Sequence, residues 1–362
     1  MKALRQVHEN AVCRVGVTFG LVMVAMFASS SRSALAAQAG KTPMPGMESS
    51  ADSTQNPSMR DMMGAPLPFG IMSGRAGQWM IGYQYMFERL DGILSGSDGI
   101  TEAGVLRDFQ TSPTDMTMQT HMGMLMYAPT DRLALMTMLP YVTMSMGEVH
   151  RDGTRSTERS NGIGDLELRG LYSLHLAKDL RHRILANFGI GFPTGSINHS
   201  DAEGSRLEYP MQTGSGTYSL LPGITYLGQL LPWSWGAEFS SKVRLGRNEH
   251  GYREGNQYEP RMWVARQLTR WVSLSAGASG ELLGNIIGTD ALLDPTDEPT
   301  KDPNRQGGKR LDAVFGATLT PLGRFFHGQQ FLVQGDVPVA QSLNGPQLKR
   351  SYMLHVAWQR EF

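Results

Sequence analysis

Methionine is the residue type whose number and spacing in this chain could support chemistry. The sequence contains 23 methionines, and 17 of them lie between Met44 and Met146. Thioether sulfurs are soft ligands that suit Cu(I) and Ag(I). Five methionines fall in a polar segment without periodicity, where a hydrophobic side chain adds little to folding: Met44, Met47, Met59, Met62 and Met63. This segment is therefore a candidate for weak Cu(I) or Ag(I) binding, with a flexible apolar filler as the alternative. No other cofactor is indicated.

Nine further methionines alternate along two segments with the period of a β-strand. They are Met116, Met118, Met122, Met124 and Met126 in the first segment and Met136, Met138, Met144 and Met146 in the second. A four-residue turn at residues 128–131 would pair Met126 with Leu133 and direct the first set toward lipid, so that the second set faces the interior. On such strands we favour the role of flexible apolar filler over metal ligation.

Hydrolytic chemistry has weak support. Asn198-His-Ser200 contains a nucleophile and a base, but no recognisable motif surrounds it, and His121 has no evident serine partner. The chain also has no glycine-rich loop of the P-loop or dinucleotide-binding type. We therefore predict that the protein is not an enzyme.

The N-terminus has the order of a secretory signal peptide. A basic start with Lys2, Arg5 and Arg14 precedes an apolar run at residues 15–28, and an Ala-x-Ala type cleavage site ends near Ala36. The apolar run is too short to span a membrane as a helix. We therefore expect residues 1–37 to be removed during export.

The exported chain has a nearly balanced charge and no cysteine. The only cysteine is Cys13, within the signal peptide. Removing residues 1–37 leaves 29 positive and 32 negative side chains, a formal net charge of −3. This balance gives no reason to expect nucleic acid as a partner. Residues 38–75 are rich in Met, Pro and Ser, and we expect a flexible periplasmic leader there.

The chain ends in an amphipathic strand. In KRSYMLHVAWQREF, residues Tyr352, Trp358 and the terminal Phe362 share one parity, and polar residues dominate the other. The segment resembles the closing strand of a bacterial outer-membrane β-barrel, in which the terminal phenylalanine is the usual assembly signal. An edge strand of a soluble β-domain is the alternative.

Strands and breaks alternate regularly over residues 76–362. We expect twelve strands, although ten to fourteen are compatible with the pattern: 78–90, 115–127, 132–146, 163–176, 182–193, 216–228, 233–246, 257–268, 271–284, 310–320, 329–337 and 349–362. Long polar breaks alternate with short breaks that carry Pro, Asp or Gly. Membrane barrels sort their loops in this way, with long loops outside and short turns in the periplasm. The predicted fold is therefore all-β, a single transmembrane antiparallel barrel.

Motifs in the middle of the chain resemble the outer-membrane transporter family of the phenol meta-degradation (MetA) pathway. The resemblance rests on YAPTDRLAL at 127–135 with MLPY at 138–141, NGIGDLELRGLY at 161–172, GIGFPTGS at 189–196, and GSGT at 214–217 followed by LPGI at 221–224. Ala128 departs from the glycine usual in the first motif. The resemblance implies a barrel and uptake of small, often aromatic or apolar compounds, and it supplies no catalytic residues.

The sequence thus predicts an outer-membrane channel for small, apolar or aromatic molecules. Its expected partners are membrane lipid, the barrel assembly machinery and the solute. The alternative is a methionine-rich protein that handles copper or silver in a metal-resistance system. By parity, the candidate lumen residues are Gln84, Glu88, Gln119, His121, Asp165, Glu167 and Arg169. For Asp165 we favour hydrogen bonding to neighbouring backbone over contact with a solute.

Overall fold

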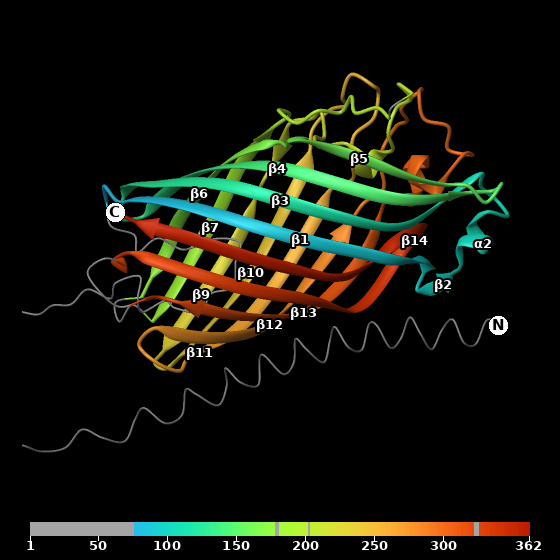
Figure 1. Cartoon of the computed structure of the whole chain (residues 1–362). Coiled ribbons are helices and arrows are strands. Elements are labelled where there is room, and N and C mark those ends of the chain that lie inside the picture. Colours follow the sequence, from blue (N-terminus) through green and yellow to red (C-terminus); the bar gives the residue numbers. More distant parts are fainter. Residues whose placement is uncertain (1–75, 178–180, 202, 322–325) are drawn as a thin grey trace, which may run out of the picture. The chain divides into compact units, whose positions relative to one another are not determined.

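The computed structural model describes residues 76–177, 181–201, 203–321 and 326–362 (Figure 1). The predicted signal peptide and leader lie outside these residues, and so do Met44, Met47, Met59, Met62 and Met63. Within the described ranges, no helix is long and apolar enough to cross a membrane.

Strands make up most of the described chain. They are β1 (Trp79–Gly96), β2 (Asp98–Ile100), β3 (Thr111–Thr130), β4 (Leu133–His150), β5 (Arg155–Ile163), β6 (Leu166–Leu176), β7 (His182–Phe192), β8 (Ser219–Leu220), β9 (Gly223–Leu230), β10 (Trp233–Arg244), β11 (Gln257–Gln267), β12 (Val272–Leu283), β13 (Gly308–Leu319) and β14 (Gln329–Glu361). The short helices are α2 (Glu102–Val105), η2 (Tyr209–Met211), η3 (Pro299–Lys301) and η4 (Pro303–Arg305).

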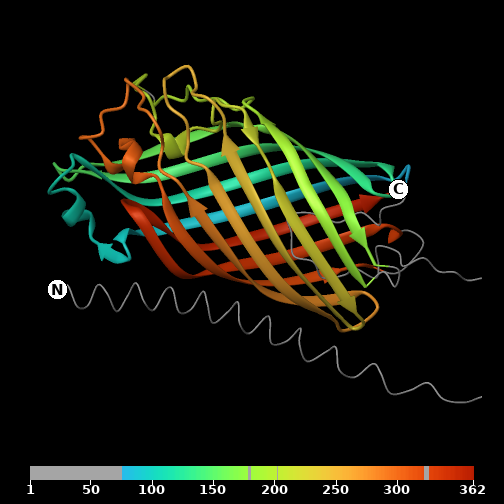
Figure 2. The same ribbon diagram turned by 180° about the vertical axis from the view of Figure 1, so that it is seen from behind.

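The strands form one closed antiparallel ring. Its order is β1, β3, β4, β6, β7, β9, β10, β11, β12, β13 and β14, and β14 returns to β1. The first part of β14 pairs with β13 and the last part pairs with β1, so β14 contributes two legs. Counting the two segments of β14 separately gives twelve barrel strands, the number predicted from the sequence. Figures 1 and 2 show the tilted strands from opposite sides. Closure matters because an unpaired backbone amide in hydrocarbon costs several kcal/mol.

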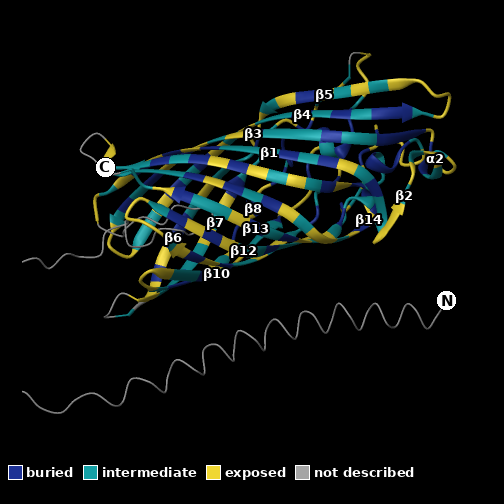
Figure 3. Cartoon of the chain, turned by 60° about the horizontal axis from the view of Figure 1, so that its bottom comes forward, coloured by how far each residue is buried: buried dark blue, intermediate teal, exposed yellow. Residues whose placement is uncertain are grey.

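Alternation along each strand separates a lipid-facing surface from the interior (Figure 3). On β1, Trp79, Ile81 and Tyr83 are exposed, whereas Met80 and Gln84 are buried inside the ring. Exposed aromatic residues gather near both ends of the strands: Trp79, Tyr172, Trp233 and Trp271 toward the short turns, and Tyr141, Tyr218, Tyr258 and Tyr352 toward the long loops. Aromatic girdles of this kind mark the two membrane interfaces of an outer-membrane barrel.

The strand predictions are confirmed with small changes of boundary, but several short elements inside the predicted long loops were missed. Strand β5 continues the sheet beyond the point where β4 leaves β6: β4 pairs with β6 up to Met138 and with β5 from Tyr141 onward. The sequence of β5, RSTERSNGI, is polar as far as Asn161, which fits a part of the sheet that extends beyond the aromatic girdle. The predicted long loop at 91–114 contains β2 and α2.

The two ends of the described chain meet at the seam of the ring. The backbone N–H of Phe362 donates to the carbonyl of Trp79 at 2.8 Å, and the N–H of Trp79 donates back at 3.3 Å. From there β14 pairs with β1 over its C-terminal leg, including Trp358 opposite Tyr83. The side chain of Phe362 is 63% exposed. The last strand therefore closes the ring, as its resemblance to a closing strand implied, while the role of Phe362, Trp358 and Tyr352 in assembly stays a prediction.

Deleting Phe362 should lower the amount of folded barrel in the outer membrane. The deletion removes the two backbone hydrogen bonds between Phe362 and Trp79, and it removes the exposed aromatic ring. The measurement is the folded fraction in outer-membrane preparations, read from the mobility of unheated and heated samples on a gel. Phe362→Trp serves as the control because it keeps the backbone pairing and an aromatic terminus. Equal folded fractions for the deletion and the wild type would refute the assembly role.

Candidate functional site

A wall of methionines lines the interior face of β3 and β4. Four pairs stand directly opposite one another across the two strands: Met116 and Met146, Met118 and Met144, Met124 and Met138, and Met126 and Met136. Seven of these eight side chains are buried, Met118 being the partly buried one. The outer end of the wall joins an apolar cluster at the mouth, and its inner end joins a second cluster near the short turns.

The predicted register of this hairpin was wrong. Tyr127 pairs with Leu135 and Thr130 with Leu133, so β3 holds one extra residue between these pairs. This bulge replaces the expected four-residue turn. Met126 thus lies opposite Met136 and not opposite Leu133, a shift of three residues. Because side chains alternate with a period of two, any odd shift exchanges the two faces of the strand. The first set of methionines therefore faces the lumen, together with the second set.

The same shift corrects two predicted lumen residues. Gln119 and His121 lie on the outward face of β3. The hydroxyl of Tyr85 donates to Gln119 Oε1 at 3.0 Å, and the hydroxyl of Tyr83 lies 2.6 Å from His121 Nδ1. These outward tyrosines supply the hydrogen bonds that polar side chains need at a lipid-facing surface.

The other predicted residues of β1 do face the lumen. Gln84 is buried and hydrogen-bonded to His355 at 3.0 Å. The carboxylate of Glu88 contacts the guanidinium of Arg350 at 2.6 Å. Arg350 also contacts Asp312 at 2.8 Å and Glu281 at 3.3 Å. A surface of ion-paired side chains therefore lies beside the methionine wall, on the adjacent strands β1, β14, β13 and β12.

On β6, the predicted residues Glu167 and Arg169 point inward. Glu167 contacts Arg169 at 2.7 Å and Lys242 of β10 at 2.6 Å. The charges of Glu167, Arg169 and Lys242 thus offset one another at short range, which lowers the cost of burying them.

Two cavities follow the methionine wall. The outer cavity has a volume of about 320 Å³, and its lining includes Met116, Met118 and Met146. The inner cavity has a volume of about 270 Å³, and its lining includes Met122 and Met138. Arg244 and Glu254 line both cavities and form an ion pair with each other. This pair is therefore a partition between two compartments that share one apolar wall.

Comparison with known protein families shows to which family this chain belongs. The family model described as "Putative MetA-pathway of phenol degradation" matches residues 96–321, which is more than half of the chain. The chain belongs to this family. The resemblance seen in the motifs is therefore confirmed, and the comparisons give no support to the metal-resistance alternative.

The chain is similar to solved structures at low sequence identity. An outer membrane channel from Pseudomonas putida F1 is 16% identical, with a TM-score of 0.54 over 79% of this chain and 96% of that chain. The P. putida toluene transporter TodX is 12% identical, with a TM-score of 0.39 over 79% of this chain and 90% of that chain. A Pseudomonas aeruginosa FadL homologue is 11% identical, with a TM-score of 0.34 over 79% of this chain and 89% of that chain. No curated protein matches. The chain is an outer-membrane β-barrel.

The phenol-degradation family motifs converge on Asp165. One carboxylate oxygen accepts from the backbone N–H of Gly195 at 3.1 Å, and the other accepts from the N–H and the hydroxyl of Ser215 at 3.1 and 2.6 Å. Gly195 and Gly214 lie back to back, and a Cβ on Gly214 would sit 2.3 Å from the carbonyl carbon of Gly195. Three motifs distant in sequence thus build one anchor for the loop at 193–218, and the structural role expected of Asp165 fits these contacts.

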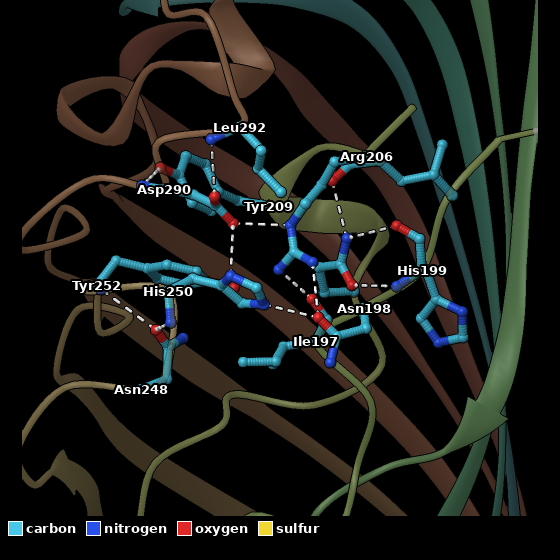
Figure 4. Close-up of polar contacts among 12 residues, drawn as sticks. Ile197, Asn198, His199, Arg206, Tyr209, Asn248, His250, Tyr252, Asp290 and Leu292 are labelled. Atoms are coloured by element: carbon cyan, nitrogen blue, oxygen red, sulfur yellow. Dashed lines mark hydrogen bonds and ion pairs between the residues drawn. The ribbon is translucent and has the colours of Figure 1, made fainter. Parts of the chain in front are cut away.

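The anchored loop reaches into the mouth of the barrel, where it meets the loop at 284–307 (Figure 4). Arg206 contacts Asp290 at 2.7 Å, and the hydroxyl of Tyr209 accepts from the backbone N–H of Asp290 at 3.0 Å. Residues on both sides of this contact line the outer cavity, including Tyr209 and Ile286. We call these two loops, at 193–218 and 284–307, the roof of the outer cavity. The sequence analysis did not predict the roof because its contacts join loops that have no periodic pattern.

The histidine and serine considered for hydrolysis belong to the same roof. His199 Nε2 lies 2.9 Å from the hydroxyl of Thr213, and Asn198 Oδ1 accepts from Arg206 at 2.8 Å. Burial, followed by the charge of Arg206, lowers the pKa of His199. Ser200 forms a backbone bridge with Arg206. These contacts hold the loop together, and a serine–histidine pair is not among them.

Asp165→Ala should release the loop at 193–218 from the lumen. The substitution removes three hydrogen bonds to a carboxylate, and such bonds contribute about 1.5–3 kcal/mol each. We expect faster tryptic cleavage within the loop and a higher single-channel conductance. Asp152→Ala is the matched control, because Asp152 also accepts two hydrogen bonds, but in the exposed turn between β4 and β5. Unchanged cleavage in Asp165→Ala would contradict the anchor.

Proposed function

We propose that this protein passes small apolar or aromatic molecules across the outer membrane along its methionine wall. The main observation behind the proposal is that methionines of this wall line both cavities. The family description, which concerns phenol degradation, supports an aromatic class of solute.

The chemistry of methionine suits this role. The side chain is unbranched and flexible, so neighbouring thioethers can adjust to aromatic solutes of different shape. Favourable contacts between sulfur and an aromatic ring contribute about 0.3–1.5 kcal/mol. The adjoining charged surface is already paired, as in the contacts of Arg350 with Glu88 and Asp312. A phenolic hydroxyl can therefore turn toward polar groups while its ring stays on the methionines.

Passage by this route needs no covalent step. The solute would move by diffusion between weak binding positions, and neither ATP nor a catalytic residue is required. We propose accordingly that the protein acts as a channel and not as an enzyme. The family and the fold, both those of outer-membrane channels, support this assignment.

The barrel assembly machinery is the protein partner that we propose for the nascent chain. The exposed aromatic face of the C-terminal leg of β14 supports this proposal, since Tyr352 and Phe362 are both exposed there. Lipid then covers the same face once the ring has closed.

Liposome swelling tests transport directly. Liposomes with the wild-type protein should swell faster in phenolic solutes than empty liposomes. The double variant Met118→Gln, Met122→Gln should slow phenol entry at least about threefold, because it removes two sulfur–aromatic contacts. Entry of a sugar of similar size should change less, since the pore keeps its width.

Met353→Gln is the control for this experiment. Met353 lies on the lumen-facing parity of β14, opposite Glu88, and it lines neither cavity. The proposal fails if wild-type liposomes swell in phenols no faster than empty ones. It also fails if the double variant and Met353→Gln reduce phenol entry equally.

Arg244→Ala should join the two cavities and raise the conductance. Arg244 and Glu254 form the partition, and alanine removes the guanidinium while leaving the half-buried carboxylate of Glu254 in place. The measurement is single-channel conductance in planar bilayers. Arg253→Ala is the control because Arg253 directly precedes Glu254 in the chain and lines neither cavity. An unchanged conductance in Arg244→Ala would show that the partition does not limit flow.

A further inference from the structure

Three buried glutamates meet above the membrane, beside the roof of the outer cavity. Glu148 stands near the outer end of β4, Glu208 directly precedes η2, and Glu298 directly precedes η3. One carboxylate oxygen of each lies within 4.8 Å of the others. The three residues are 5%, 4% and 1% exposed. Elements far apart in the sequence therefore bring acidic groups together in a place that water scarcely reaches.

These carboxylates lack the hydrogen bonds that buried polar groups normally make. Neither oxygen of Glu298 has a hydrogen-bond partner, although its side chain is almost completely buried. Glu208 Oε2 and Glu148 Oε1 also have none. The remaining oxygen of Glu148 accepts from the hydroxyl of Ser156 at 3.1 Å. Each of the three residues thus offers an oxygen without a hydrogen-bond donor, and these are the atoms that can bind a ligand where the side chains converge.

The carboxyl groups of the cluster also outnumber the cation that lies beside them. Lys301 Nζ lies 3.3 Å from Glu298 and 3.9 Å from Glu208, but its shortest contact, at 2.8 Å, is with Asp297 at the edge. Among the described residues, Lys301 is the cation in ion-pair contact with this group, and three carboxylates share it: Asp297, Glu298 and Glu208. Burial first, and then repulsion by Glu298, raises the pKa of Glu148 to about 8 and that of Glu208 to about 10. Such groups take up either protons or a metal cation.

We propose that Glu148, Glu208 and Glu298 form a binding site for a divalent cation of the Ca²⁺ type. The ligands are all carboxylate oxygens, which hard cations prefer. Ca²⁺ binds oxygen at about 2.3–2.6 Å and accepts irregular geometry, so it can bridge oxygens as far apart as these. Mg²⁺ requires shorter bonds and nearly ideal octahedral geometry. Soft cations such as Cu(I) favour thioether or thiolate sulfur instead.

The site would fasten both roof loops to the wall of the barrel. The loop at 193–218 supplies Glu208, the loop at 284–307 supplies Glu298, and β4 supplies Glu148. The loops already contact each other through Arg206 and Asp290 (Figure 4). Tyr209 and Thr300, which lie one and two residues beyond the loop ligands, line the outer cavity. Cation binding would therefore stabilise the roof of the compartment through which we propose that solutes enter.

Calorimetric titration of the purified full-length barrel tests the site. After treatment with EDTA and removal of the chelator, the wild type should bind about one equivalent of Ca²⁺ per chain, and its Tm should rise as a bound ligand stabilises the folded state. Mg²⁺ should bind more weakly. Glu298→Gln should weaken Ca²⁺ binding about tenfold or more, since one of three charged ligands is lost. Asp294→Asn, which changes an exposed carboxylate of the same loop, should bind Ca²⁺ as the wild type does.

The metal-free proteins supply a second readout. If the cluster serves a cation, Glu298→Gln should have a Tm in EDTA equal to or above that of the wild type, because it relieves repulsion. If the cluster instead works through Lys301 alone, the same variant should lose stability in EDTA, and Ca²⁺ should leave the wild-type Tm unchanged. That second pattern would overturn the proposal, as would the absence of binding heat at millimolar Ca²⁺. Both readouts are independent of solute transport.

Discussion

Backbone hydrogen bonding around a closed ring is the constraint on which the rest of this structure depends. The backbone amides of each barrel strand form hydrogen bonds with the two neighbouring strands, and the C-terminal segment of β14 pairs with β1 beside Trp79. Hydrocarbon offers no substitute partner for an amide, so an open edge is excluded within the membrane. Once the ring is closed, alternation assigns every strand residue to lipid or to the lumen. The methionine wall, the paired charges and the aromatic girdles all follow from that assignment.

Much of the architecture was predictable because it rests on periodic patterns. Alternating hydrophobicity located the strands, and the sorting of long and short breaks indicated a membrane barrel. The hairpin of β3 and β4 shows where this reasoning ends. Its register depends on one extra residue between Tyr127 and Thr130, which the hydrophobic pattern does not reveal because methionine suits lipid and a packed interior equally. For this reason Gln119 and His121 lie on the outward face of β3 and not on the lumen face expected from the sequence.

The roof of the barrel was beyond prediction for a different reason. Its contacts join residues such as Arg206 and Asp290, or Asp165 and Ser215, that lie far apart in the sequence and in segments without periodicity. Short motifs marked the glycines and the aspartate that the anchor needs, but not their mutual contact. Only the folded chain shows that the backbones of Gly195 and Gly214 lie so close together that neither position has room for a Cβ atom. The acidic cluster at Glu298 belongs to the same class of long-range arrangement.

The shared boundary of the two cavities has a kinetic consequence. Arg244 and Glu254 divide the route into compartments in series, and each compartment has room for a small aromatic ring. A solute that dwells in one compartment blocks the next arrival until it moves on. Flux through such a route saturates as the outside concentration rises, and two similar solutes compete for the same positions. A barrel without any moving part or chemical step can in this way show the saturation and competition usually associated with carriers.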